Sequence, residues 1–259
     1  MSMLKGATLA QAGLDGVALK PTEVDVSRAA ALDVEVITID YEGNEHVPDA
    51  DVLTDLAADK SVRVTAPVRA DGFDPQGDDS LLSSLPAPVD PVLVAGNPAY
   101  LTDEECRRPV APRLDAAADG DHWVGTEGVE RTALAVGGTQ FELLSRTSMR
   151  DLQSLRAAGF DGELALYAPT VVTDDEDAIL DGLGAYLSRR RPVRQALPEG
   201  ARTDSAAEGR ARNVLLQAAS DYALVGTQSD VADRVEQFRE AGADVVVGYP
   251  ARGLDPVLE

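Results

Sequence analysis

The chain has 259 residues, and its 45 acidic and 23 basic side chains give a formal net charge of −22 at pH 7. Hydrophobic residues make up 44% and charged residues 26%, a globular composition that excludes a wholly disordered chain. Nucleic acids and anionic membrane surfaces are not expected partners, because binding them requires a basic face that this composition does not favour.

The acidic charge is typical of proteins from a salt-accumulating cytoplasm such as that of haloarchaea, where salt screens the repulsion between like charges. Cys106 is the only cysteine, so no intrachain disulfide can form and a reducing cytoplasm is expected. No apolar run approaches the roughly 20 residues that a membrane span needs. We therefore expect a cytoplasmic protein.

Short, apolar, β-branched runs alternate with segments of helical period along the chain. The runs predict strands at 17–19, 34–39, 62–68, 91–96, 122–125, 132–136, 141–144, 164–167 and 245–249. Helices are predicted at 23–32, 50–59, 148–158, 175–190, 205–220 and 229–241, with Ser229 as a candidate N-cap of the last. The composition of residues 71–90 predicts a long loop or an irregular helix there, and that of residues 192–206 predicts a loop between two helices.

One pattern recurs where a helix is expected to end and a strand to begin. Small residues and a glycine precede an aspartate and then an apolar run, as at Gly13-Leu14-Asp15, Gly159-Phe160-Asp161 and Gly242-Ala243-Asp244. Glycine ends helices well because it adopts positive φ without steric cost. Repeated helix-to-strand units favour a parallel sheet. The number of strands favours a closed (β/α)8 TIM barrel over an open doubly wound sheet. We expect this barrel to span 1–259 as a single, somewhat truncated domain.

In such a barrel, ligands bind at the carboxyl ends of the strands. Lys20, Asp40, Arg69 and Asn97 follow the first four predicted strands. Lys20 and Arg69 are candidate substrate or phosphate ligands, whereas Asp40 and Asn97 are candidate cofactor ligands. For Lys20 a solvated strand end, and for Asp40 a turn cap, remain the plainer interpretations.

The segment after Trp123-Val124 carries the best phosphate-binding candidate. Gly125, Thr126 and Gly128 form a glycine turn after a strand, where backbone N–H groups can face an anion. Glu127 places a negative charge in the same turn, so an ordinary turn remains the alternative.

Two histidines, His46 and His122, lie far apart in the sequence and have no cysteine partners at metal-binding spacing. A multi-histidine metal site is therefore not expected. The four arginines Arg189, Arg190, Arg191 and Arg194 are expected to close the helix over 175–190, where basic side chains complement the helix dipole. A cluster of arginines can also bind phosphate, but the C-terminal end of a helix disfavours an anion.

Several segments resemble the luciferase-like flavin- or deazaflavin-dependent oxidoreductases. The stretch 224–247 resembles the last helix and strand of that family, and Gly248-Tyr249-Pro250 continues as in its methylenetetrahydromethanopterin reductase branch. Residues 30–40 and 52–64 resemble its first two helix-to-strand units. Residues 123–130 resemble the glycine turn that meets the cofactor phosphate in the family.

The sequence also departs from this pattern. Tyr41 follows Asp40 where the family often has histidine, and the Arg-His-Pro motif after the fourth strand is absent. Asn97-Pro98 is present there, but no Gly-x-Gly segment follows. These departures concern the wall that would hold the cofactor and substrate.

The resemblance implies an oxidoreductase that uses FMN or a deazaflavin for hydride transfer to a small substrate, and a homodimer, as is common in the family. Under this hypothesis Gly125, Thr126, Gly128, Asp40 and Asn97 bind the cofactor, and no catalytic residue is assigned. The alternative is a degenerate barrel without cofactor that binds or scaffolds other molecules. A third hypothesis is a lyase or isomerase acting through Lys20 on a phosphorylated ligand.

Overall fold

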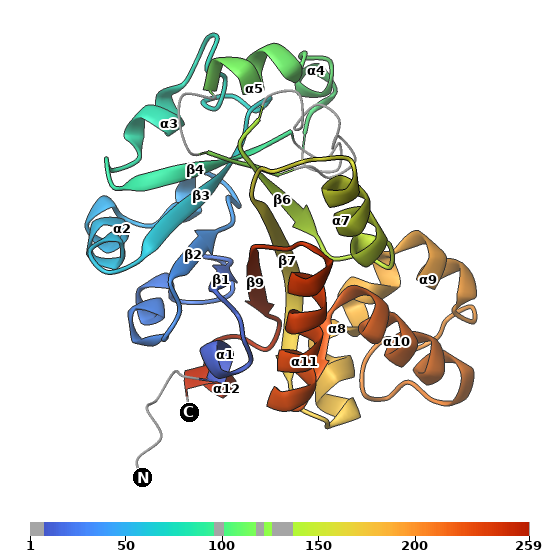
Figure 1. Ribbon diagram of the computed structural model, residues 1–259. Helices are drawn as coiled ribbons and strands as arrows, with labels where there is room; N and C mark the ends of the chain where they lie inside the picture. The colour runs from blue at the N-terminus through green and yellow to red at the C-terminus, as the bar shows by residue number, and fades with distance from the viewer. Residues whose placement is uncertain (1–7, 96–100, 118–121, 126–136, 259) are drawn as a thin grey trace.

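A computed structural model describes residues 8–95, 101–117, 122–125 and 137–258. Eight parallel strands close into a barrel (Figure 1). In the order in which they pair they are β1 (Gly16–Leu19), β2 (Val36–Ile39), β3 (Ser61–Pro67), β4 (Val89–Val94), β5 (Trp123–Gly125), β6 (Thr139–Leu143), β7 (Leu164–Val172) and β9 (Val245–Pro250). The pairing of β9 with β1 closes the ring, so the expected (β/α)8 TIM barrel is confirmed.

A ninth strand, β8 (Leu224–Gly226), lies outside this ring. It pairs with the last three residues of β7, while β9 pairs with the preceding part of β7. The sequence analysis did not predict β8, because a three-residue strand is too short to show a period. The weak strand expected at 132–136 lies outside the described residues.

Helical segments surround the barrel. They are α1 (Thr8–Gln11), the 3-10 helices η1 (Val26–Ala31) and η2 (Asn44–His46), α2 (Ala50–Ala57), α3 (Ser80–Ser84), α4 (Asp103–Cys106), α5 (Ala111–Ala117), α7 (Ser148–Ala157), α8 (Glu176–Arg189), α9 (Arg191–Ala196), α10 (Gly209–Tyr222), α11 (Gln228–Ala241) and α12 (Asp255–Leu258). The main core lies between the strands and these helices and includes Leu19, Ile37, Val246 and Phe238.

Three of the predicted local features need correction. Residues 191–196 form α9, not a loop, because Pro192 lies in the first turn, where its missing N–H costs no helical hydrogen bond. Arg191 and Arg194 therefore belong to α9 and do not close α8. The N-cap of α11 is Thr227, not Ser229: the Thr227 hydroxyl accepts from the Asp230 N–H, and the Asp230 carboxylate accepts in return from the Thr227 N–H.

The recurring glycine-to-aspartate pattern marks the ends of helices as expected. Gly13, Gly159 and Gly242 all have positive φ. Asp15 accepts a hydrogen bond from the N–H of Val246, and Asp244 accepts one from the N–H of Leu164. The pattern thus places a carboxylate at the amino ends of neighbouring barrel strands.

Helices α8, α9 and α10 lie together on one side of the barrel (Figure 1). They have their own apolar core, which includes Leu180, Leu183, Leu187, Val193 and Leu215. Gly184 of α8 permits the closest contact in this unit, since a Cβ there would lie 1.9 Å from the carbonyl oxygen of Thr203. Within the described residues, no helix is long and apolar enough to cross a membrane.

Candidate active site

The barrel interior is lined by alternate residues of the strands. Leu19, Ile37 and Ile39 point outward into the main core, so Ala18, Thr38 and their register neighbours point inward. The inward set forms a separate cluster that contains Ala18, Val92, Trp123, Phe141, Ala165, Tyr167, Val247 and Tyr249. This cluster is the floor beneath the carboxyl ends of the strands, where barrel enzymes bind their ligands.

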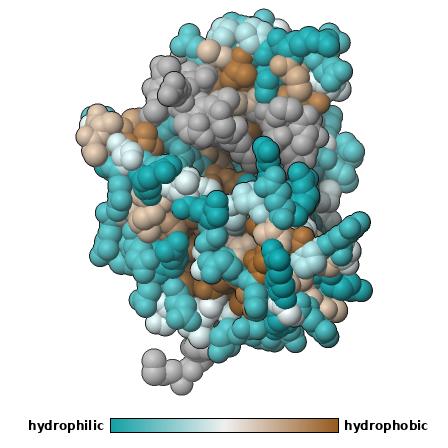
Figure 2. Space-filling model, turned by 90° about the vertical axis from the view of Figure 1, so that its right-hand side faces the viewer, coloured by the Kyte–Doolittle hydropathy of each residue, from teal (hydrophilic) through white to brown (hydrophobic). Residues whose placement is uncertain are grey.

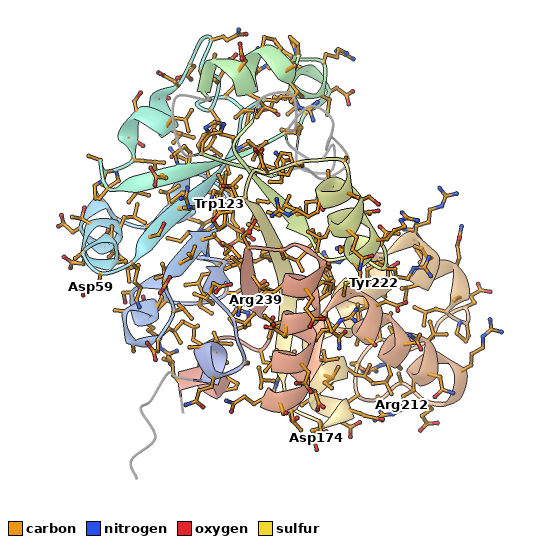
Figure 3. The ribbon with its side chains drawn as sticks, in the orientation of Figure 1. Asp59, Trp123, Asp174, Arg212, Tyr222 and Arg239 are labelled. Atoms are coloured by element: carbon orange, nitrogen blue, oxygen red, sulfur yellow. The ribbon has the colours of Figure 1, made fainter. Side chains whose placement is uncertain are left out.

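Four of these side chains form an interior aromatic row: Trp123, Phe141, Tyr167 and Tyr249. Trp123 lies inside the barrel (Figure 3). Its ring centroid is 5.2 Å from that of Phe141, Phe141 is 5.7 Å from Tyr167, and Tyr167 is 6.3 Å from Tyr249. The row extends from β5 across β6 and β7 to β9, and Tyr249 lies one residue before the end of its strand.

A cation covers each end of the aromatic row. The Arg63 guanidinium lies 4.6 Å from the Trp123 ring centroid, and Lys20 Nζ lies 4.8 Å from that of Tyr249. Such contacts are favourable because the ring face carries negative charge. Lys20 follows β1 and Tyr249 nears the end of β9, so this end of the row lies at the barrel mouth.

Glu23 connects Lys20 and Tyr249 at the mouth. Its carboxylate accepts a hydrogen bond from the Tyr249 hydroxyl and lies 3.6 Å from Lys20 Nζ. Burial raises the pKa of Tyr249 far above the usual value for a phenol, and the bond to Glu23 raises it further. The Tyr249 phenol therefore stays protonated at neutral pH, and its hydroxyl donates its hydrogen bond to Glu23.

Tyr167 is the other hydroxyl-bearing residue of the row. Burial raises its pKa strongly, and the nearby charge of Asp40 adds to this effect. Thr38 is fully buried on the inner face of β2, and its hydroxyl has no hydrogen-bond partner among the described residues. The interior thus holds neutral polar groups close to an aromatic surface.

The predicted site residues lie at separate points around the mouth. Lys20 and Asp40 lie beside the Tyr249 end, since the charge of Asp40 also raises the Tyr249 pKa. Gly125 ends β5, where an added Cβ would lie 3.2 Å from Val94 Cγ2. Arg69 donates from Nε to the Ala95 carbonyl over 2.6 Å and from Nη1 to the Cys106 carbonyl over 3.1 Å.

Asn97, Thr126 and Gly128 lie outside the described residues. The structure therefore brings Lys20 and Asp40 together and places Gly125 apart from them, at the end of β5 and across two intervening strands from β2. The binding roles assigned to all seven residues stay predictions.

Acidic groups dominate the rim over β1, β2 and β9. Glu42 accepts hydrogen bonds from the backbone N–H of Thr22 over 2.9 Å and from its hydroxyl over 2.6 Å, which joins the segments after β1 and β2. Glu23, Asp40 and Glu42 together contribute to the raised pKa of Tyr249. This side of the rim does not suit an anionic group.

The aromatic row was missed by the sequence analysis. Its members are scattered along the chain, and their contacts arise only when the barrel closes. The available signal was the two-residue alternation within strands, which places Tyr249 on the same face as Val247 and Val245. Among the described residues, no group of three or more His, Cys, Asp or Glu side chains could hold a metal ion.

The fold and the mouth at the carboxyl ends of the strands define a TIM-barrel protein with an aromatic floor. Residues 9–257 match a family of unknown function, DUF7388, and the chain belongs to this family. No curated protein matches the sequence.

Solved structures share the fold. The coenzyme F420-dependent tetrahydromethanopterin reductase from Methanopyrus kandleri superposes with a TM-score of 0.62 and 16% sequence identity, over 93% of this chain and 94% of that chain. An F420-dependent secondary alcohol dehydrogenase, solved with an F420–acetone adduct, gives a TM-score of 0.54 and 14% identity over the same shares. At this identity the likeness establishes the fold alone.

Proposed function

We propose that the protein is a luciferase-like oxidoreductase that binds a deazaflavin or flavin at the barrel mouth and transfers hydride to or from a small substrate. The observation that carries the proposal is the aromatic row, which reaches the mouth through Tyr167 and Tyr249. Both solved relatives described above are F420-dependent oxidoreductases with the same fold.

The residues present fit the ring system of such a cofactor better than its anionic tail. Aromatic side chains that reach the mouth suit a flat heterocycle. The acidic rim around Glu23 and Glu42 would repel a phosphate. The tail is therefore expected on the opposite side, over β3 to β5, where Arg69 and Gly125 lie and where Asn97, Thr126 and Gly128 follow in the sequence.

The bound cofactor would supply the hydride chemistry, and the chain would bind and orient the reactants. The aromatic row keeps water from the floor of the site. Tyr249 keeps its proton on the phenol oxygen, in the hydrogen bond to Glu23, and its ring would bind and orient the reactants at the mouth. Lys20 keeps positive charge over the Tyr249 ring.

Titration with F420 and with FMN tests the proposal, with the fluorescence of each cofactor as the signal. The titrations are run in molar KCl, because the charge of −22 predicts expansion of the chain at low salt. We expect saturable binding of one cofactor, weakened about tenfold in Tyr249→Ala by loss of the ring contact. Arg150→Gln, a substitution on an exposed face of α7, is the matched control and should leave binding unchanged.

A non-catalytic binding barrel is the second candidate. Lys20 and Tyr249 both contact Glu23, so the charges and the hydroxyl of these three rim residues are paired with one another without a ligand. Failure of both cofactors to bind the folded protein would favour this candidate over the oxidoreductase. A small-molecule ligand, a homodimeric state and a high-salt cytoplasm remain part of the proposal.

A further inference from the structure

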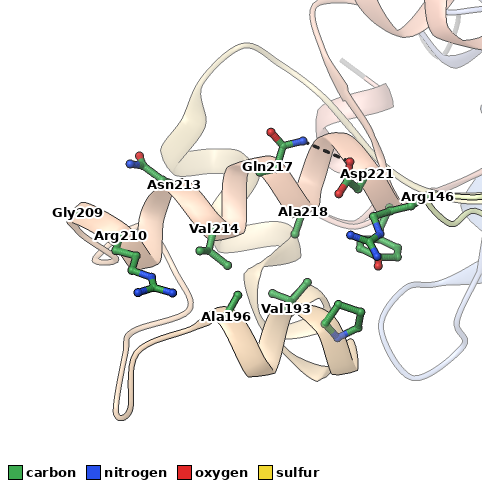
Figure 4. Close-up of a pocket in the computed structure, with 12 residues that line it drawn as sticks. Arg146, Val193, Ala196, Gly209, Arg210, Asn213, Val214, Gln217, Ala218 and Asp221 are labelled. Carbon is green, nitrogen blue, oxygen red and sulfur yellow. Dashed lines mark hydrogen bonds between the residues drawn. The ribbon is translucent and has the colours of Figure 1, made fainter.

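A cleft of about 560 Å³ lies between α9 and α10, outside the barrel. Val193 and Ala196 of α9 face Val214 and Ala218 of α10 across it (Figure 4). The exposed surface of the cleft is mostly apolar, and its volume is in the range of small-molecule sites. The side of the molecule that carries these helices shows hydrophobic residues in hollows between hydrophilic ones (Figure 2).

An arginine lies at each end of the cleft. Arg210, in the first turn of α10, lies at one end, and Arg146, from the segment between β6 and α7, lies at the other (Figure 4). Neither guanidinium forms an ion pair with any residue that the structure describes, in contrast to Arg212 of α10, which pairs with Glu176 and Asp177. Unpaired arginines beside an apolar surface are unusual in a chain with twice as many acidic as basic side chains.

The surroundings of the cleft add positive charge. Arg189, Arg191 and Arg194 are exposed at the junction of α8 and α9, next to the residues of α9 that line the cleft. Arg190 is held differently, with its guanidinium over the rings of Tyr186 and Tyr222. This side of the molecule is therefore locally basic, which favours an anionic ligand.

The two ends of the cleft differ in charge. Asp221 lies at the Arg146 end, where its carboxylate accepts from Gln217 Nε2 over 3.3 Å. At the Arg210 end, the neighbouring lining side chain is the neutral Asn213. An anionic head group is therefore favoured at Arg210, and an apolar body would extend along α10 toward Ala218, about 12 Å away at 1.5 Å per residue.

We propose that this cleft binds a small amphipathic carboxylate, with its head group at Arg210 and its apolar body between α9 and α10. Arg210 and the Asn213 amide provide donors for the carboxylate, and Val193, Val214 and Ala218 contact the apolar chain. This site does not depend on the barrel mouth or on the proposed cofactor.

Calorimetric titration with sodium decanoate, below its micelle concentration, tests the site. We expect saturable binding of one molecule per chain, and binding at least fivefold weaker for decanol, which lacks the charge. Arg210→Gln should weaken decanoate binding about tenfold through loss of a charge-assisted hydrogen bond. Arg146→Gln should weaken it less, because Asp221 disfavours an anion there.

Two further variants keep the result interpretable. Ala196→Phe fills the cleft from a partly exposed position and should abolish binding while circular dichroism shows a folded protein. Arg150→Gln removes one exposed positive charge that does not line the cleft and should bind as the unmodified chain does. Equal affinity for decanoate and decanol, no saturable binding, or an unchanged affinity in both Arg210→Gln and Ala196→Phe would overturn the proposal.

Discussion

The two ends of the barrel use charged side chains in different ways. At the amino ends of the strands, Arg239 binds Asp15 over 2.7 Å and the Gly13 carbonyl over 2.8 Å. Arg156 likewise pairs with Asp244 and donates to the carbonyls of Gly162 and Gly242. Each pair joins the end of a helix to the start of a strand.

At the carboxyl ends, the charges join side chains of the mouth to one another. Lys20, Glu23 and Tyr249 form one group, and Thr22 and Glu42 join two loops. Removing a residue at the amino ends should therefore lower stability, whereas removing one at the mouth should change ligand binding with little loss of stability. This division agrees with the general separation of stability and activity in TIM barrels.

The largest effect is expected for Asp15→Ala at the amino end. The Asp15 carboxylate accepts hydrogen bonds from both Arg239 and the N–H of Val246, the second residue of β9. Loss of two bonds to a charged, partly exposed group should lower the free energy of unfolding by about 2–3 kcal/mol. Urea denaturation measures the change, and a loss below that of the mouth variants would contradict the division between the two ends.

A second, smaller loss of stability is expected for Gly242→Ala. Gly242 has a φ of 116°, and an added Cβ would lie 2.5 Å from Arg156 Cγ. Strained backbone and the displaced Arg156 side chain should together cost about 1–2 kcal/mol. Gly200→Ala gives the cost of an ordinary left-handed position, because Gly200 has a φ of 69° and no atom lies within 4 Å of its added Cβ. A smaller loss in this variant would show that the φ of 116° and the Arg156 contact together add to that cost, and an equal loss would contradict the prediction.

Much of this architecture could be predicted from the sequence, because it depends on local patterns. Gly13, Gly159 and Gly242 each mark a helix end, and short apolar runs mark most of the barrel strands. The contacts of Arg156 and Arg239 could not be predicted, since each joins segments that are more than 80 residues apart.

The candidate site was less accessible to sequence analysis for the same reason. Lys20 and Asp40 were identified because each follows a strand. The aromatic row depends on the register of four strands, and the cleft depends on α9, which the sequence predicted as a loop. Composition gave the net charge but not the basic region around α9.

At the mouth, Tyr249→Phe should change the alkaline stability more than the stability at neutral pH. The pKa of Tyr249 is raised in the folded protein, so folding favours the protonated phenol. The stability that this contributes is fully present below the unfolded pKa of about 10 and is lost as the pH rises above it. Tyr249→Phe should therefore show a weaker loss of stability between pH 10 and 11 in urea denaturation. A steeper loss of stability with pH in Tyr249→Phe than in the unmodified chain would contradict a raised pKa of Tyr249 in the folded protein.

The smallest effect is expected for Thr22→Val. This change removes the hydroxyl bond to Glu42 but leaves the backbone N–H bond in place. Because the contact is exposed, the free energy of unfolding should change by no more than about 0.5 kcal/mol. A loss of stability as large as that of Asp15→Ala would show that contacts at the mouth also stabilise the barrel. The division of stability and binding between the two ends would then be wrong. An unchanged stability with altered cofactor affinity would instead assign the loops after β1 and β2 to the binding site.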